Sequence, residues 1–258
     1  MTNTAVLGID IGGSGIKGAP VDLGKGEFAT DRLRIPTPSP STPQAVAEVV
    51  AQIADHFAEQ IGDAPIGVTI PAVVTHGRTR SAANIDKTWI DAAAEEIFSL
   101  QLGRPVHVAN DADAAGIAEV KYGAAKDHDG LVMVTTLGTG IGTALIYRGI
   151  LVPNTELGHL EIDGHDAETQ AAASAKTRLG LSYAEYVPRL QRYYETLERL
   201  FSPDLFVVGG GISKDSEKFL PGLALKTPII PARLRNRAGI IGAAWLAADA
   251  AGRTDLLG

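Results

Sequence analysis

A glycine-rich segment near the start of the sequence carries a carboxylate and a lysine among small residues. It follows an apolar run and reads Asp10-Ile11-Gly12-Gly13-Ser14-Gly15-Ile16-Lys17. Glycines let backbone N–H groups approach phosphate oxygens, because no Cβ stands in the way. Asp10 is suited to hold Mg²⁺ through water, and Lys17 adds a positive charge. The segment therefore predicts a phosphate-binding turn between two strands, although an ordinary tight hairpin explains it equally well when it is taken alone.

The same glycines match the dinucleotide pattern G-x-G-x-x-G at residues 13–18, but the surrounding sequence argues against that interpretation. A dinucleotide-binding fold needs a helix directly after the glycines. Here Pro20 interrupts the following segment, which has no helical period. The P-loop pattern G-x-x-x-x-G-K-[ST] is absent as well. A strand–turn–strand hairpin is therefore the better interpretation.

Two later segments repeat this chemistry. Residues 136–143 place glycines and small hydroxyls between two predicted strands, and residues 207–213 place three consecutive glycines after a strand and before Lys214. Three such loops in one chain form a more specific pattern than any one of them. The predicted phosphate and nucleotide contacts are Asp10, Gly12, Gly13, Ser14, Gly15, Lys17, Thr139, Gly140, Gly210, Gly211 and Lys214.

An Asn–Asp pair stands where a predicted strand gives way to a predicted helix. Asn110 and Asp111 follow the strand 105–109 and precede the helix 112–122. Both residue types are good helix N-caps. Taken by themselves, they predict no more than a well-formed start of a helix.

The elements that must position these residues form a pattern that starts twice. Predicted strands cover 4–11, 15–22, 26–35, 65–70, 73–81, 105–109, 130–137, 141–148 and 205–208. Predicted helices cover 43–60, 90–102, 112–122, 166–179, 182–201 and 238–250. A strand, a glycine-rich turn and a returning strand open the chain and occur again near residue 130. This weak duplication predicts two similar α/β lobes with an interlobe cleft for ligands.

The three loops resemble the phosphate and adenosine motifs of the actin–hexokinase–Hsp70 superfamily. Glu156-Leu157-Gly158-His159 resembles the signature of the ROK family of repressors, open reading frames and sugar kinases. Residues 81–89, 108–116 and 156–168 are similar to one branch, the polyphosphate glucokinases. The resemblance covers essentially the whole chain. It implies the α/β actin-like ATPase (ribonuclease H-like) fold, with lobes at 1–109, completed by the helix 238–250, and at 110–237.

The resemblance also implies an activity. It points to a glucokinase that transfers a terminal phosphoryl group from inorganic polyphosphate and/or ATP to the 6-hydroxyl of glucose, with Mg²⁺ and with mannose as a second candidate acceptor. Asp111 corresponds to the general base, a role that suits a carboxylate within hydrogen-bond reach of the hydroxyl. The implied sugar contacts are Asn84, Asn110, Asp111, Glu156, His159 and Glu168.

One departure from the family concerns zinc. Many ROK proteins hold a zinc ion with the histidine of the Glu-x-x-Gly-His segment and three nearby cysteines, whereas this chain contains no cysteine. A zinc site of that kind cannot form without thiolates. We therefore expect no zinc and a sugar contact for His159, as in the polyphosphate glucokinases.

The charge distribution bears on the phosphoryl donor and on partners. The net charge of −7 argues against a nucleic-acid partner, yet residues 189–237 hold nine Lys and Arg against five Asp and Glu. Such a basic segment is suited to guide a polyanion such as polyphosphate, although solvated helix faces are the simpler reading. No apolar run is long enough for a membrane span, and neither cysteines nor a secretory signal pattern is present. A cytoplasmic protein is expected, and the resemblance implies a homodimer.

Two alternatives remain open. One is a ROK kinase that uses only ATP and acts on another hexose. The other is a non-catalytic ROK sugar sensor. A ROK repressor carries an additional helix-turn-helix domain before the first phosphate strand. In this sequence we predict that strand from residue 4, so we do not expect a repressor of that kind.

Overall fold

A computed structural model describes residues 5–82 and 85–257. By its internal contacts the chain divides into two compact units. Unit 1 comprises residues 1–118 and 237–258, and unit 2 comprises residues 119–236. The predicted lobes differ from these units mainly in the start of the helix after Asn110, which lies in unit 1.

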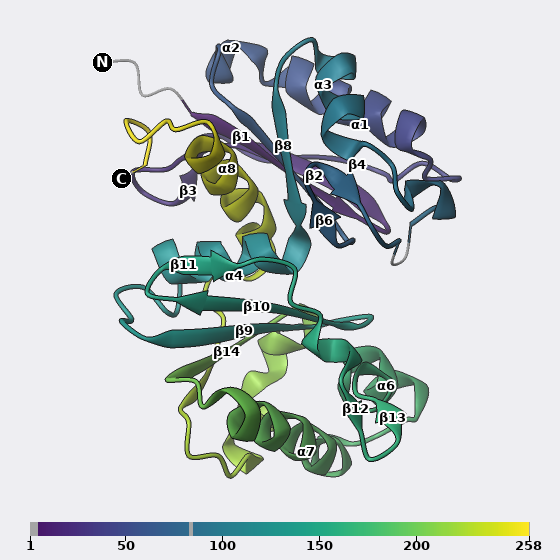
Figure 1. Cartoon of the computed structure of the whole chain (residues 1–258), viewed down its shortest axis with the longest axis vertical. Coiled ribbons are helices and arrows are strands. Elements are labelled where there is room, and N and C mark those ends of the chain that lie inside the picture. Colours follow the sequence, from purple (N-terminus) through teal and green to yellow (C-terminus); the bar gives the residue numbers. More distant parts are fainter. Residues whose placement is uncertain (1–4, 83–84, 258) are drawn as a thin grey trace. The chain divides into compact units, whose positions relative to one another are not determined.

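Unit 1 is built on a sheet with the strand order β3-β2-β1-β5-β8, and β4 also pairs with β2 (Figure 1). β1 and β2 are antiparallel, whereas β5 runs parallel to both β1 and β8. The strands are β1 Val6–Gly12, β2 Gly15–Asp22, β3 Glu27–Phe28, β4 Leu33–Ile35, β5 Ile66–Ile70 and β8 Val106–Asn110. A small separate hairpin joins β6 Val74–Thr75 to β7 Arg78–Thr79.

Unit 1 also contains helices and one 3₁₀ turn, some of which pack against this sheet. They are α1 Pro43–His56, α2 Ala58–Ile61, the 3₁₀ turn η1 Lys87–Trp89, α3 Ala94–Leu102, α4 Asp111–Tyr122, which extends past residue 118, and α8 Ala238–Ala250. Thr42 accepts a hydrogen bond from Ala45 N, and a proline opens α1 at residue 43, where the predicted helix begins. The predicted helix 43–60 is interrupted at Phe57, whose backbone leaves the helical region. Apolar residues of α1, α3 and the strands form one continuous core.

Glycines bring α8 unusually close to its neighbours. A Cβ on Gly8 of β1 or on Gly67 of β5 would lie 1.9 Å from a backbone carbonyl oxygen of α8. A Cβ on Gly242 of α8 would lie 1.8 Å from the Ala114 carbonyl oxygen of α4. Real Cβ atoms do not approach so closely, so this packing exists only because these positions lack a side chain.

Unit 2 contains a sheet with the order β11-β10-β9-β14-β15 (Figure 1). Its strands are β9 Leu131–Leu137, β10 Ile141–Tyr147, β11 Ile150–Val152, β14 Leu205–Gly209 and β15 Ile229–Pro231, and a separate hairpin joins β12 Glu161–Ile162 to β13 His165–Asp166. Its helices are α5 Glu168–Ala171, α6 Ala173–Arg178 and α7 Tyr183–Phe201. Its 3₁₀ turns are η2 Leu157–His159, η3 Gly211–Lys218, η4 Leu220–Gly222 and η5 Arg235–Arg237, the last of which ends at the unit boundary.

The long helix α7 supplies much of the core of unit 2. A capping box between Ser182 and Glu185 fixes its start. Its buried face carries Tyr186, Leu190 and Tyr194, which pack with apolar residues of the sheet and of η3. Among the described residues, no helix is both long enough and apolar enough to span a membrane.

Candidate functional site

The first glycine segment forms the predicted strand–turn–strand hairpin. β1 pairs with β2 so that Asp10 faces Lys17 and Gly12 faces Gly15. Asp10 Oδ1 accepts a hydrogen bond from the Thr69 hydroxyl at 3.1 Å, and Asp10 Oδ2 lies 3.7 Å from Lys17 Nζ. The carboxylate is therefore oriented by neighbours but still partly exposed, which suits a metal held through water.

The hairpin also has a cation that the sequence did not reveal. Arg34 lies on β4 opposite Lys17, and its Nη2 donates a hydrogen bond to the Ser14 carbonyl oxygen at 2.7 Å. A Cβ on Gly15 would lie 2.6 Å from Arg34 Nε, so the glycine makes room for the guanidinium. Arg34 thus places a second positive charge against the predicted phosphate turn. Only the pairing of β4 with β2, a long-range feature, identifies it.

The second and third glycine segments lie beside each other in unit 2. Leu137 and Ile141 close the β9–β10 hairpin, and Ser174 of α6 holds the turn by donating to the Thr139 carbonyl oxygen at 2.6 Å. Gly210 has a φ of 80°, and a Cβ there would lie 2.3 Å from the Leu137 carbonyl oxygen. The second hairpin is therefore confirmed, and the late glycine loop packs directly against it.

Asn110 and Asp111 occupy the junction of β8 and α4. Asn110 is buried; its Oδ1 accepts hydrogen bonds from the backbone N–H groups of Ala112 and Asp113, and its Nδ2 donates to the Ala72 carbonyl oxygen at 3.1 Å. These contacts make it a helix cap, and its role as a sugar ligand stays a prediction. Asp111 is only partly buried, and its Oδ1 accepts from Ala112 N at 2.9 Å.

The three sugar contacts predicted in unit 2 are Glu156, His159 and Glu168, and their side chains lie close together. His159 Nδ1 is 2.8 Å from Asp166 Oδ2, and His159 Nε2 is 4.0 Å from Glu156 Oε2. The Glu168 carboxylate accepts from Ile141 N at 3.0 Å, while Glu168 N donates to Asp166 Oδ1 at 3.1 Å. Asp166 was not predicted, yet it joins the other side chains. Asn84, the remaining predicted sugar contact, lies outside the described residues.

The charges in this cluster influence one another. Burial raises the pKa of the Glu156 carboxyl, and the charge of Glu168 adds to the effect. The hydrogen bond with Asp166 raises the pKa of His159, and the nearby carboxylates raise it further. The imidazole is therefore held more firmly in its protonated form than a free histidine. The cluster offers both donors and acceptors, as binding several sugar hydroxyls requires.

The same cluster has some features of a cation site. His159, Asp166 and Glu168 each offer one ligand atom, and these atoms lie within 4.8 Å of one another. In this structure two of these side chains hydrogen-bond to each other. With no cysteine in the sequence, the three-thiolate zinc set of many ROK proteins cannot form here.

Comparisons with known proteins identify the family of this chain. The sequence model of the ROK family matches residues 6–178. A polyphosphate glucokinase of Mycobacterium tuberculosis is 49% identical over 239 residues, which make up 92% of this chain and 89% of that protein. The crystal structure of the inorganic polyphosphate/ATP-glucomannokinase of Arthrobacter sp. strain KM aligns with a TM-score of 0.91 at 55% identity, over 96% of this chain and 100% of that chain.

A more distant structure bears on the fold alone. The ROK family glucokinase of Streptomyces griseus, in complex with glucose and AMPPNP, aligns with a TM-score of 0.81 at 23% identity, over 95% of this chain and 99% of that chain. The fold is therefore that of the ROK sugar kinases, the actin-like ATPase fold that the family resemblance implied.

Proposed function

Because the chain belongs to the ROK family, we propose that it is a glucokinase that transfers the terminal phosphoryl group of polyphosphate or ATP to the 6-hydroxyl of glucose. The observation that carries the proposal is the cluster of Glu156, His159 and Glu168. It is assembled from separate elements in a chain 55% identical to a polyphosphate/ATP-glucomannokinase. The name of that relative also supports mannose as a second acceptor.

The proposed roles follow the chemistry of each group. Asp111 accepts the proton of the sugar hydroxyl as the bond to phosphorus forms. Glu156, His159 and Glu168 bind sugar hydroxyls, together with Asn110 and Asn84. The backbone N–H groups of the glycine turns, with Lys17, Arg34 and Lys214, bind the phosphate donor. Asp10 is the residue that would hold Mg²⁺ through water, and a bound Mg²⁺ would supply charge neutralisation at the donor phosphates.

The decisive experiment is a substrate panel. Glucose, mannose, fructose and N-acetylmannosamine are combined with ATP, GTP or polyphosphate in the presence of Mg²⁺, and the sugar phosphate formed is quantified. The proposal expects glucose 6-phosphate with both ATP and polyphosphate. Product formed only from ATP and a hexose other than glucose would support an ATP-dependent kinase for that hexose. No product with any pair would indicate a non-catalytic sugar sensor.

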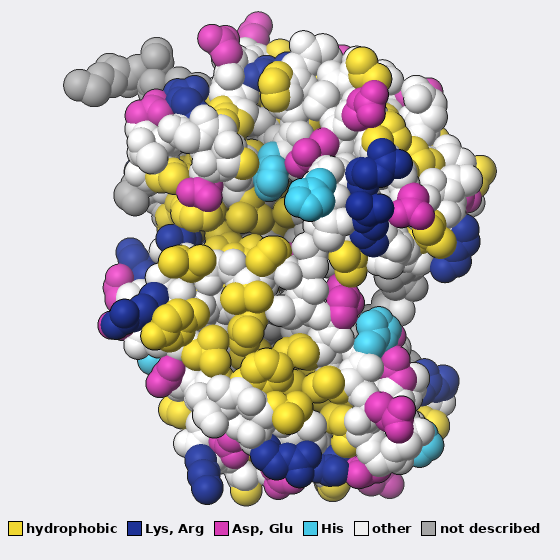
Figure 2. All heavy atoms as spheres, in the orientation of Figure 1, with side chains coloured by type: hydrophobic (Ala, Val, Ile, Leu, Met, Phe, Trp, Pro, Cys, Tyr) yellow, Lys and Arg dark blue, Asp and Glu magenta, His cyan; other side chains and the backbone are white. Residues whose placement is uncertain are grey.

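The proposal that polyphosphate serves as donor rests in part on the basic segment 189–237. Figure 2 shows basic and acidic side chains side by side over the part of unit 2 where α7 lies. Arg192 pairs with Asp163, and Lys218 pairs with Asp215. Any track for a polyanion therefore relies on other cations, such as Lys214. Rising salt should weaken polyphosphate use more than ATP use, and equal sensitivity would argue against an extended track.

Three further expectations complete the proposal. The purified protein should contain far less than one zinc ion per chain by elemental analysis, since no thiolate is present. It should behave as a homodimer in size-exclusion chromatography with light scattering. A fluorescent fusion should remain in the cytoplasm.

Gly140→Ala should weaken sugar binding. A Cβ at this position would lie 2.2 Å from Glu168 Oε2, the atom that accepts from Ile141 N. Displacing a carboxylate from a charge-assisted hydrogen bond should raise the KM for glucose about tenfold. Steady-state kinetics at saturating ATP would show this. Gly138→Ala in the same turn is the control, because a Cβ there meets nothing within 4 Å. Equal KM values for the two variants would contradict the assignment of Glu168.

Glucose binding should weaken at alkaline pH. His159 has a raised pKa, so it keeps its charge to a higher pH than a free histidine and loses it as the pH rises through that raised value. The neutral imidazole no longer balances Glu156 and Glu168. Because the imidazole is half exposed, the KM for glucose should rise only about three- to fivefold. The pH profile of KM tests this, and His159→Gln should remove the alkaline rise. An unchanged profile in that variant would exclude His159 as its source.

A further inference from the structure

A buried carboxylate lies at the point where the chain first enters unit 2. The chain passes between the units twice: the first passage, between Ala118 and Glu119, is within α4, and the second, between Asn236 and Arg237, is within η5. Glu119 is only 1% exposed, and it is not among the residues that we predict to bind sugar or phosphate. Burying a carboxylate is unfavourable unless hydrogen bonds compensate, so this residue calls for an explanation of its own.

The Glu119 carboxylate accepts hydrogen bonds from the segments that carry both passages. Its Oε2 accepts from Ala124 N at 2.7 Å, just after α4, and from Arg233 N at 3.1 Å. Its Oε1 accepts from Leu234 N at 2.7 Å, just before η5. Gly123 makes room for this arrangement, because a Cβ there would lie 2.0 Å from Oε2. One side chain thus ties the end of α4 to the start of the second passage.

The same two segments also touch in unit 1. A Cβ on Gly242 of α8 would lie 1.8 Å from the Ala114 carbonyl oxygen of α4, so the two helix backbones are in direct contact. Ala114 comes shortly before the first passage, and Gly242 comes shortly after the second. α4 and the segment that runs from residue 233 into α8 are therefore fastened to each other inside each unit.

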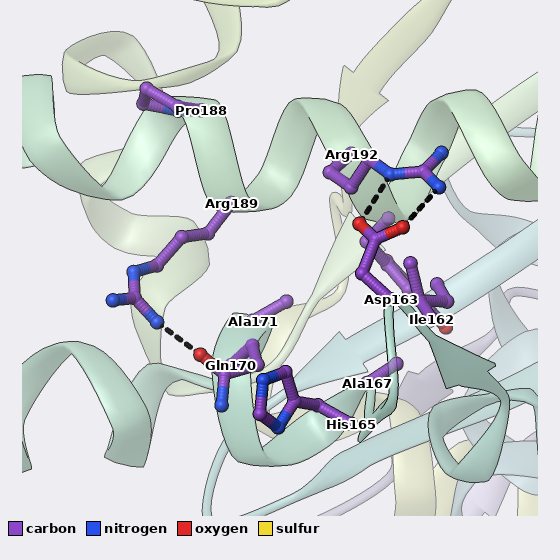
Figure 3. Close-up of a pocket in the computed structure, with 10 residues that line it drawn as sticks. Ile162, Asp163, His165, Ala167, Gln170, Ala171, Pro188, Arg189 and Arg192 are labelled. Atoms are coloured by element: carbon purple, nitrogen blue, oxygen red, sulfur yellow. Dashed lines mark hydrogen bonds and ion pairs between the residues drawn. The ribbon is translucent and has the colours of Figure 1, made fainter.

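Other carboxylates of unit 2 differ from Glu119 in what they connect. Asp163, in the β12–β13 turn, accepts two hydrogen bonds from Arg192 of α7, both at 2.7 Å (Figure 3). Glu198 of α7 accepts from Thr227 N at 2.6 Å, in the loop before β15. Within the described residues, these bonds join elements inside unit 2 that carry neither passage. They therefore supply controls for the loss of a carboxylate bond as such.

We infer that Glu119 is a positioning residue that couples the two passages, so that α4 and residues 233–237 move as one body. Hinges between parts of a protein are usually a few residues at the ends of elements, as η5 and the turn after α4 are. With the passages coupled, any motion of one unit against the other bends both segments together. Without the Glu119 carboxylate each segment can bend by itself, and the relative orientation of the units becomes less restricted.

The coupling bears on the proposed reaction through α4. Asp111, the proposed base, begins this helix and lies eight residues before Glu119, which is about 12 Å along a helix. The proposed reaction also uses groups of both units. A misplacement of about 1 Å can lower a rate about 100-fold, so Glu119→Gln should lower kcat by about ten- to hundredfold. The KM for glucose should change less, because the cluster of sugar contacts lies inside unit 2. This consequence rests on the proposed function, whereas the coupling does not.

The test measures the distance between spin labels in the full chain. Because the sequence contains no cysteine, Gln52→Cys on α1 and Arg199→Cys on α7, both at exposed positions, take one label each. Double electron–electron resonance should show a broader distance distribution when Glu119→Gln is added, since its amide presents N–H donors where the carboxylate accepted. Gly123→Ala should broaden the distribution as well, by displacing the carboxylate. Glu198→Gln is the matched control and should leave it unchanged.

Hydrogen exchange shows whether the bonds themselves are lost. The Leu234 amide should exchange about ten- to hundredfold faster in Glu119→Gln, as expected for loss of a hydrogen bond to a charged group, and at the wild-type rate in Glu198→Gln.

Distance distributions as narrow as in the wild type for both Glu119→Gln and Gly123→Ala would overturn the inference, even with faster exchange at Leu234. Circular dichroism identifies any variant that unfolds, and Gly123→Ala, which keeps the carboxylate, provides the test if Glu119→Gln does so. A broadened distribution with unchanged kcat would overturn the link to the reaction. If the distribution broadens while the wild type phosphorylates no sugar, the coupling stands and the proposed kinase function fails.

Discussion

Asp111→Asn is expected to lower kcat for glucose phosphorylation by about 10²–10⁴-fold, the usual contribution of a general base. Glucose binding should change little, because an amide still forms hydrogen bonds with a sugar hydroxyl. The fold should also persist. The Asp111 side chain accepts from Ala112 N at the start of α4, and asparagine serves as well as aspartate at a helix start.

Three measurements separate catalysis from structure in this variant. Single-turnover kinetics report the chemical step, equilibrium binding reports affinity for glucose, and thermal denaturation reports stability. Asp249→Asn, at an exposed position near the end of α8, is the matched control and should retain wild-type kcat. Turnover of Asp111→Asn within about threefold of the wild type would exclude a general base there, since it falls far below the expected loss.

Gly242→Ala should strongly destabilise unit 1. The added Cβ would lie 1.8 Å from the Ala114 carbonyl oxygen and 2.4 Å from the Ala114 carbonyl carbon. Both are backbone atoms, so no side chain can rotate away, and α8 has to shift relative to α4. Overpacking of this kind destabilises a protein by about 3 kcal/mol, and for a chain of this size the melting temperature should fall by roughly 6–12 °C.

The control for this prediction is Gly24→Ala in the turn after β2. A Cβ there meets only the Asp22 carboxylate, at 3.3 Å, and the glycine does not have a positive φ. Differential scanning calorimetry of the two variants should show a large shift for Gly242→Ala and a small one for Gly24→Ala. Melting temperatures within about 2 °C of the wild type for both, no more than the smallest shift expected for 1 kcal/mol, would show that α8 is not held as closely as described.

Local features of the sequence predicted the secondary structure of the phosphate segments. The β1–β2 and β9–β10 hairpins form as expected, because glycine turns between apolar strands depend on residues close in sequence. The same holds for the start of α1, where Thr42 and Pro43 act within one turn. The sugar segment was predicted through its resemblance to a family, and the structure brings its side chains together.

Other features depend on contacts that periodicity does not show. The predicted helix 166–179 divides at Ala172, whose backbone is extended, and α5 thereby becomes a short helix beside the β12–β13 hairpin. Asp166 acquires a role only because this hairpin returns it to His159. Similarly, the buried carboxylate of Glu119 accepts hydrogen bonds from Arg233 N and Leu234 N, which lie far away in the sequence.

The close packing of α8 has a consequence for the order in which the two units fold during synthesis. On the ribosome, the strands β1 and β5 emerge long before α8, the helix that packs against them. Residues 119–236 are synthesised in between and form a unit with a core of their own. Unit 2 can therefore fold first. Until α8 is synthesised, the surface of β1 and β5 stays exposed and prone to aggregation. Chains that end at residue 236 and have left the ribosome should accordingly resist proteolysis in unit 2 and depend on chaperones to protect unit 1.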